Sequence, residues 1–211
     1  MLETIFPPGC VVVVGLKSEA ALLPRSVRVV ISGGNSQRLA ALLPKDATAV
    51  LSFGIAGGLA PGMGTGVLLL ASAIWEAGET LPIDERWQAA LAACIPARLG
   101  LLAASDTLLD SIVAKALLYG NSGALAVDME SGVAARFALA RGIPFAALRA
   151  VADGPQDAVP RAAVVGLKPD GSAAPGRVLA ALLRRPTELP ALLRLARASA
   201  QAHAALRLAL A

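Results

Sequence analysis

The chain has 211 residues and a formal net charge of +4; 56% of its residues are hydrophobic, 16% are charged and 3% are aromatic. This length and apolarity indicate one α/β domain over residues 1–211, with an extensive core or an oligomer interface, and no boundary that divides the chain in two. The scarcity of aromatic residues argues against a stacking platform for single-stranded nucleic acid, so we expect no nucleic-acid partner.

The cysteines and the histidine argue against further classes. Cys10 and Cys94 are isolated and His203 is the only histidine, so neither a disulfide framework nor a metal site is expected. A Ser-His-Asp hydrolase is disfavoured because no GxSxG motif is present. No apolar segment reaches about 18 residues without a charge or a Gly/Pro break, so we expect a cytoplasmic protein with no signal peptide or spanning helix.

The first half of the chain alternates between strand and helix patterns. Strands are expected over 10–15, 27–31, 48–53, 67–73 and 99–104, and helices over 36–43, 84–94 and 108–118, the second capped by Asp84. Three glycine-bearing turns, at 33–34, 54–58 and 62–66, lack the full dinucleotide-binding and P-loop patterns. The alternation predicts a largely parallel sheet between helices.

A strand-helix-strand unit follows at 124–151. Its strands, 124–127 and 145–151, are almost continuously apolar, and the helix between them is expected over 131–142. Acids stand at the carboxyl ends of both strands, where open α/β sheets place their sites.

Five acids in all occupy strand-end positions, and each is either a helix cap or a functional group. Carboxylates can accept both vicinal hydroxyls of a sugar and can pass a proton to a leaving group. The five are Glu19, Asp106, Asp128, Glu130 and Asp153.

The last part of the chain is first rich in Pro and Gly and then basic. Residues 154–176 are expected to form a loop of the kind that serves as a lid or faces a substrate, with helices over 176–185 and 187–209. From residue 177 onward there are six arginines and a single acid, Glu188. This pattern fits either a solvated helix face or a contact with an anionic membrane surface.

Several segments in order resemble the superfamily of purine nucleoside phosphorylases and methylthioadenosine/adenosylhomocysteine nucleosidases, over about residues 10–157. Gly54-Ile55-Ala56-Gly57-Gly58-Leu59 is similar to its glycine-rich turn, and Ser105-Asp106-Thr107-Leu108 to its purine-facing segment. Val127-Asp128-Met129-Glu130 is similar to its ribose motif, and Arg149-Ala150-Val151-Ala152-Asp153 to the motif of its acid.

The resemblance implies a three-layer α/β/α sandwich with a mixed, largely parallel central sheet, and a set of site residues. Asp153 would protonate the purine at N7, and Glu19 would orient an attacking water. Glu130 would bind the ribose hydroxyls, with Met129 packed on the sugar and Arg149 buttressing Asp153. Further substrate-binding residues would be Ala56, Gly57, Asp106, Leu108 (where the family often has an aromatic residue) and Asp128.

The nucleophile is either phosphate or water. Ser52 stands where many phosphorylases carry a phosphate-binding arginine, although Ser32, Gly33 and Arg38 are candidates for a different anion pocket. A resemblance of the carboxyl-terminal motifs to a group of phosphorylases favours phosphate, whereas the absent arginine favours water. Of the two nucleophiles, we expect phosphate. No cofactor is expected beyond inorganic phosphate as a co-substrate.

The carboxyl-terminal motifs at 165–171, 182–186 and 188–190 resemble the hopanoid-associated phosphorylases. We expect a homo-oligomer (dimer or trimer); the carboxyl-terminal resemblance implies release of adenine from adenosylhopane, in hopanoid biosynthesis, with peripheral membrane contact. It also implies an apolar channel from the sugar site to the surface near 154–176 and 177–207. The alternatives are a conventional methylthioadenosine/adenosylhomocysteine-type nucleosidase and a non-catalytic nucleoside-binding protein of the same fold.

Overall fold

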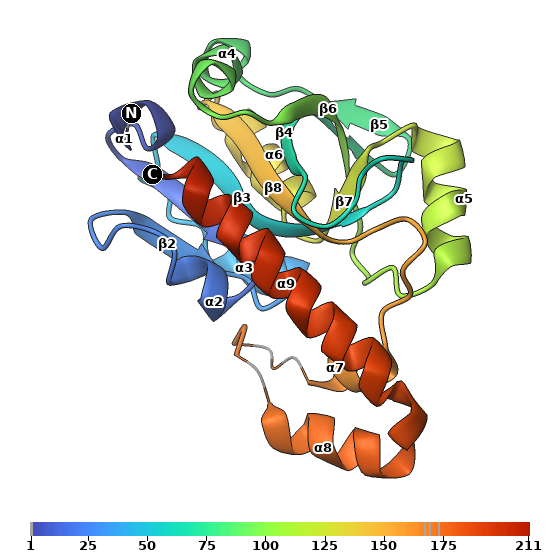
Figure 1. Ribbon diagram of the computed structural model, residues 1–211. Coiled ribbons are helices and arrows are strands. Elements are labelled where there is room, and N and C mark those ends of the chain that lie inside the picture. The colour runs from blue at the N-terminus through green and yellow to red at the C-terminus, as the bar shows by residue number, and fades with distance from the viewer. Residues whose placement is uncertain (1, 167, 169, 173) are drawn as a thin grey trace.

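The structure is a computed structural model that describes residues 2–166, 168, 170–172 and 174–211. Within them, eight strands form one mixed sheet (Figure 1). The strands are β1 (Cys10–Val14), β2 (Arg28–Ile31), β3 (Ala49–Gly58), β4 (Leu68–Glu76), β5 (Glu79–Leu81), β6 (Arg98–Ala104), β7 (Ala126–Asp128) and β8 (Phe145–Asp153). Their order is β2-β1-β3-β7-β6-β4-β5, and β8 pairs with both β3 and β4.

The pairings around β8 bend the sheet back on itself. β3 pairs with β8, β8 with β4, β4 with β6, β6 with β7, and β7 again with β3, so that five strands close a ring. Three of these five pairings are parallel, and those of β3 with β7 and of β4 with β8 are antiparallel. The ring brings the carboxyl ends of β3, β6, β7 and β8 together.

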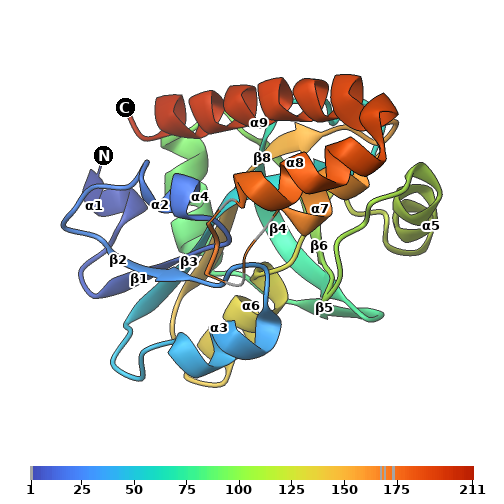
Figure 2. The ribbon, with the colours of Figure 1, turned by 90° about the horizontal axis from the view of Figure 1, so that it is seen from below.

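Helices cover both faces of the sheet (Figure 2). The helical elements are α1 (Leu2–Ile5), α2 (Lys17–Ala20), α3 (Ser36–Leu42), α4 (Glu85–Cys94), α5 (Ile112–Ser122), α6 (Ser131–Leu139), α7 (Arg161–Val165), α8 (Pro175–Arg184), the 3₁₀ turn Pro186–Glu188 and α9 (Leu189–Ala209). Leu39 of α3 and Ala134 of α6 belong to one core cluster, and Leu91 of α4 and Leu206 of α9 to the cluster on the other face. The expected three-layer arrangement with a mixed sheet is confirmed.

Most predicted elements lie within a few residues of their predicted places. Asp84 caps α4 as expected, its side chain accepting a hydrogen bond of 2.8 Å from the backbone N–H of Trp87. The helix predicted over 108–118 begins only at residue 112, because the Ser111 side chain caps it through the backbone N–H of Ala114. Residues 154–176, predicted as a loop, include the short helix α7.

The glycine segment 54–58 is strand, not the predicted turn. It continues β3 and pairs with β8 from Gly54 opposite Arg149 to Gly57 opposite Asp153. In this pairing backbone groups of the segment bond to β8, whereas in a turn they would bond within the segment itself.

Across the ranges described, no helix combines the length and apolarity needed to cross a lipid bilayer.

Candidate active site

A cavity of about 190 Å³ lies at the carboxyl ends of β3, β7 and β8. It is bounded by the turn after β1 and the start of α2, the end of β3, the segment before α5, the β7–α6 junction and the end of β8. The lining residues are Gly15, Leu16, Glu19, Gly34, Ile55, Ala56, Gly57, Thr107, Leu108, Leu109, Val127, Asp128, Met129, Glu130, Ala152 and Asp153. Carboxylates therefore face an otherwise largely apolar chamber from several sides.

Glu19 is fixed at one side of this cavity by backbone donors. Its Oε2 accepts hydrogen bonds of 2.8 Å from the N–H groups of Gly15 and Leu16, and its Oε1 accepts one of 2.8 Å from Ile55. The side chain is almost fully buried, and burial raises the pKa of its carboxyl although these bonds and Arg149 act in the opposite direction.

Glu130 and Asp128 are held by Arg149 and by two serines. Arg149 Nη2 lies 2.7 Å from Asp128 Oδ2 and 3.6 Å from Glu130 Oε2. Ser32 Oγ donates to Glu130 Oε1 at 2.9 Å, and Ser131 Oγ donates to Asp128. Both carboxylates are thus oriented before any ligand arrives.

The guanidinium of Arg149 is the cationic centre of this cluster. The residue is completely buried on β8, and its Nε and Nη1 have no hydrogen-bond partner among the described residues. We predicted that Arg149 buttresses Asp153; that was wrong. Asp153 lies four residues further along β8, and Arg149 pairs instead with Asp128 and Glu130.

Three carboxylates around one guanidinium leave an excess of negative charge. Burial raises the pKa of Glu130 to about 7, helped by repulsion from Asp128 and Glu19 and opposed by Arg149. Such a site favours a ligand that carries or develops positive charge beside it.

Gly54 is required for this packing. Its φ is +149°, a backbone conformation that residues other than glycine rarely adopt. A Cβ there would lie 2.5 Å from Glu19 Oε1 and 2.8 Å from Arg149 Nη1. The missing side chain makes room for the carboxylate and the guanidinium.

Asp153 forms an ion pair with Lys115 of α5, a residue that our sequence reasoning missed. Lys115 is completely buried, and its Nζ also donates to the carbonyl oxygens of Gly154 and Asp157, both at 2.8 Å. Burial raises the pKa of Asp153, whereas Lys115 lowers it, and burial is the larger effect. The one sequence signal for Lys115 is that it is the only charged residue between Asp110 and Asp128.

Eight of the residues singled out from sequence line this cavity together: Glu19, Ala56, Gly57, Leu108, Asp128, Met129, Glu130 and Asp153. Asp106 does not; it is exposed and borders a separate hollow with α3 and α6, while its neighbours Thr107 to Leu109 take the place at the cavity.

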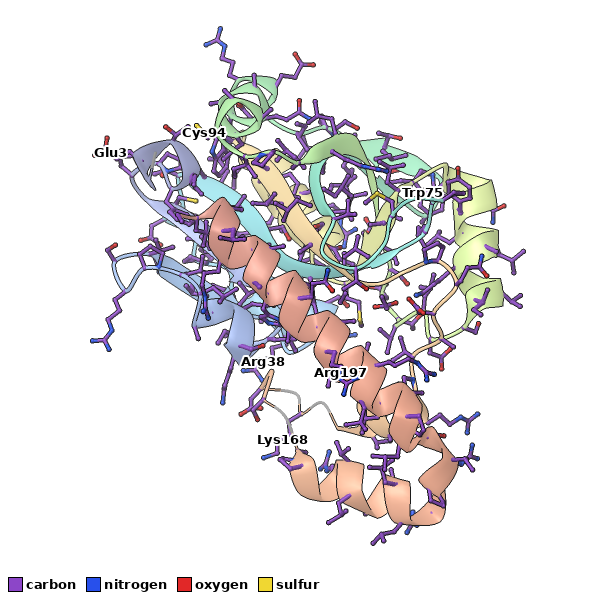
Figure 3. All side chains as sticks on the ribbon, viewed as in Figure 1. Glu3, Arg38, Trp75, Cys94, Lys168 and Arg197 are labelled. Carbon is purple, nitrogen blue, oxygen red and sulfur yellow. The ribbon has the colours of Figure 1, made fainter. Side chains whose placement is uncertain are left out.

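Ser32, Gly33 and Arg38 were the candidates for an anion pocket, but none of them lines the first cavity. Ser32 is bound to Glu130. The backbone N–H of Gly33 donates to the carbonyl of Gly15, and that of Gly34 donates to Ser32 Oγ. Arg38 lies on α3, with its backbone N–H bound to the cap residue Asn35 (Figure 3), and is not part of the cavity lining.

A second cavity of about 340 Å³ adjoins the first and shares Gly34, Leu108 and Met129 with it. Its other lining residues are Gly33, Asn35, Val159, Ala163, Val164 and Lys168, the last of which is labelled in Figure 3. The wall is therefore partly supplied by the 154–176 segment, as predicted, whereas none of the lining residues comes from 177–207.

The fold and site define an α/β protein with a preformed, acid-lined pocket at the strand ends. Residues 9–184 match the family model of the phosphorylase superfamily. The chain belongs to this superfamily, whose members cleave glycosyl bonds. No curated protein gives a significant match to the sequence.

Solved structures of the same fold include nucleosidases. A 5′-methylthioadenosine/S-adenosylhomocysteine nucleosidase from Helicobacter pylori, with butyl-thio-DADMe-Immucillin-A, superposes with a TM-score of 0.65 at 15% identity, covering 95% of this chain and 97% of that one. The S-adenosylhomocysteine nucleosidase of Streptococcus pyogenes, in complex with 5-methylthiotubericidin, gives 0.62 at 19%, covering 70% and 84%. A futalosine hydrolase of Helicobacter pylori gives 0.62 at 15%, covering 90% and 96%.

Proposed function

We propose that the chain cleaves the N-glycosidic bond of an adenine nucleoside with a large apolar 5′ substituent. The observation that carries the proposal is one cavity with Asp153 at one wall and the Arg149-anchored pair Asp128 and Glu130 at another. Asp153 suits contact with a purine, and the pair Asp128 and Glu130 suits the vicinal hydroxyls of a ribose. The named nucleosidases of the same fold support this substrate class.

The chemistry follows from the placement of the acids. As the bond between C1′ and N9 breaks, its electron pair stays with the purine and a proton passes from Asp153 to N7. A positioned acid contributes typically about 10²–10⁴-fold to the rate. The positive charge that develops on the sugar is stabilised by the surplus carboxylates, which are already in place and need no reorganisation.

The lining favours water over phosphate as the nucleophile. Among the described residues that line the first cavity there is no lysine or arginine, Lys115 and Arg149 being already paired with its acids, and the N–H groups of Gly33 and Gly34 already have acceptors. A phosphate dianion would face carboxylates without a cation. Glu19 accepts three hydrogen bonds from the described residues, which leaves one of the four acceptor positions of a carboxylate to orient a water. The sequence alone favoured phosphate as the nucleophile, whereas the lining of the cavity favours water.

The second cavity is the proposed place of the 5′ substituent. It adjoins the sugar side of the first at Met129, and the side chains of Leu108, Val159 and Val164 make much of its wall apolar. A 5′ group leaving the ribose beside Met129 would enter it. Adenosylhopane, whose 5′ carbon carries a triterpenoid, fits this chemistry and the sequence resemblance.

We further propose that the protein works at an anionic membrane surface, with α8 as the contact. None of the residues of α8 is buried, and Leu179 and Leu183, one turn apart, are 60% and 78% exposed. Arg177, Arg184 and Arg185 flank them. Figure 1 shows α8 beyond the end of α9 and away from the sheet. α9, in contrast, packs Ala202 and Leu206 into the core, which supports the solvated-face interpretation for its arginines.

A homo-oligomer remains our expectation, because α5 presents Val113 and Leu117, 68% and 63% exposed, on its surface. Light scattering on the purified protein measures the oligomeric state directly.

The decisive experiment is a product assay for adenine with adenosylhopane, 5′-methylthioadenosine, S-adenosylhomocysteine and adenosine, each with and without phosphate. We expect adenine and the ribose that keeps the 5′ substituent in the absence of phosphate, with adenosylhopane as the best substrate. Formation of the corresponding 5′-substituted ribose 1-phosphate (ribose 1-phosphate from adenosine), only when phosphate is present, would establish phosphorolysis. Preference for methylthioadenosine would identify a conventional nucleosidase, and tight binding without adenine release would identify a nucleoside-binding protein.

A further inference from the structure

Lys115 is a buried cation whose three hydrogen-bonding directions are all occupied. Its Nζ contacts Asp153 Oδ2, the carbonyl of Gly154 and the carbonyl of Asp157. An ammonium group has three N–H donors, so each finds an acceptor and the cost of burying the charge is offset. This is the pattern of a residue fixed in one position, not of a mobile surface lysine.

The same side chain joins two walls of the active-site cavity. Lys115 lies in the first turns of α5, directly after the segment Thr107–Leu109 that lines the cavity. Its three acceptors belong to the end of β8 and the turn that follows, which is closed by the N–H of Asp157 bonding to the carbonyl of Gly154 at 3.1 Å. A further bond of 2.9 Å, from the N–H of Val159 to the carbonyl of Asp110, ties the two segments together. Movement of α5 would therefore move Asp153.

The ion pair occupies only one oxygen of the Asp153 carboxylate. Lys115 holds Oδ2, and Oδ1 has no hydrogen-bond partner among the described residues. The side chain is 14% exposed and lines the cavity. Gly57 lies beside it, where a Cβ would be 3.4 Å from Oδ2, so the carboxylate is confined from the β3 side as well.

We infer that Lys115 is the positioning residue of the acid, presenting Asp153 to the purine and setting the proton affinity of its carboxyl. The inference deepens the proposed function and rests on it, since it assigns Lys115 a role through Asp153 in the same reaction. Lys115 itself touches no reacting atom; its ammonium stays paired while Asp153 exchanges the proton with N7.

The charges that face Asp153 determine the expected pH dependence. Lys115 is the cation in contact with it, and Asp157 is the acid whose charge acts on it; Asp128, Glu130 and Glu19 line the same cavity from α2 and the β7–α6 junction. Lys115 opposes burial and the charge of Asp157, which both raise the pKa of Asp153. Without Lys115, the carboxyl would hold its proton to higher pH.

The test compares Lys115→Met, Lys115→Arg, Asp153→Asn and the double variant Lys115→Met/Asp153→Asn, with Lys45→Met as the exposed-lysine control. Lys115→Met should lower kcat by about 10²-fold, as expected when a catalytic group loses its placement. The alkaline limb of its kcat profile should lie about 1–3 pH units higher than in wild type. Lys115→Arg should keep the limb in place, and Lys45→Met should behave as wild type.

The double variant separates positioning from folding support. It removes both charges and so leaves no unpaired buried ion. If Lys115 acts through Asp153, adding Lys115→Met to Asp153→Asn should change kcat by no more than about twofold, because the two effects are not additive. Independent, multiplying effects with an unmoved pH limb would overturn the inference.

A readout that needs no substrate keeps this result distinct from the proposed function. The ¹³C carboxyl resonance of Asp153, titrated by NMR in wild type and Lys115→Met, should show a higher pKa in the variant. An unchanged pKa would refute the inference even if the enzyme is active. Absence of adenine release by wild type, with the expected NMR change, would refute the proposed function and leave the pairing intact.

Discussion

The replacement Glu130→Gln tests whether the buried acid cluster carries the charge imbalance described above. Burial and neighbouring acids raise the pKa of Glu130 from 4.5 to about 7 in the folded protein. Glutamine keeps the shape and can still accept the Ser32 hydrogen bond, but it cannot ionise. The variant therefore isolates the cost of placing this negative charge beside Asp128 and Glu19.

The direction in which the free energy of unfolding changes with pH follows from proton linkage. Because the folded pKa exceeds the unfolded one, the folded protein binds the proton more tightly. The stabilisation from this group is complete below pH 4.5 and is lost as the pH rises through about 7. A difference between 4.5 and about 7 corresponds to about 3 kcal/mol of unfolding free energy. That is a large fraction of the stability of a typical domain.

Urea unfolding of wild type and Glu130→Gln at matched pH values from about 4 to about 8 measures this term. The free energy of unfolding of wild type relative to the variant should fall by about 3 kcal/mol over that range. Glu19 and Asp153 also have raised pKa values, but they are present in both proteins and largely cancel in the difference. Two curves that run parallel across the range would refute the reasoning and show that Glu130 ionises in the fold as it does in water.

Four further predictions concern the reaction, the sugar, the packing and the membrane. Asp153→Asn should lower kcat by about 10²-fold or more with the fold retained by circular dichroism, and a folded variant with wild-type adenine release would remove Asp153 from the mechanism. Glu130→Gln should weaken ribonucleosides by about 1.5–3 kcal/mol in kcat/KM and should discriminate less against 2′-deoxynucleosides; unchanged discrimination would reduce Glu130 to a structural acid. Gly54→Ala should cost about 1–3 kcal/mol in urea unfolding, while Gly64→Ala, where an added Cβ meets nothing within 4 Å and φ is not positive, should be close to neutral. Binding of wild type to anionic vesicles should decrease with salt and weaken in Leu183→Ser, and co-sedimentation that is absent at every salt concentration would exclude the membrane contact.

The strand framework could be predicted because its signals are local. Apolar runs such as 145–151, interrupted only by Arg149, have few alternatives to a buried strand, and a carboxylate that follows such a run lies at the carboxyl end of the strand. For this reason the sequence alone could group Glu19, Asp128, Glu130 and Asp153, which line one cavity in the structure.

What could not be predicted depends on contacts between distant segments. The pairing of Arg149 with Asp128 depends on how β8, β3 and β7 are aligned, and no motif in the sequence encodes this. Lys115 lies in a helix, where a lysine is usually solvated; it is buried because the Gly154–Asp157 turn folds over it. Segment 54–58 contains turn-forming glycines, and only its pairing with β8 shows that it continues a strand.

The cluster around Arg149 also constrains how the molecule can assemble. The guanidinium lies on β8, late in the chain, and the acids that neutralise it come from α2 near the amino end and from the β7–α6 junction. A partly folded chain that docks β8 before these segments would bury a cation without its partners, which costs several kcal/mol. We therefore expect the closing of the sheet and the completion of the acid-lined pocket to be one cooperative event, and intermediates on the folding pathway should be inactive.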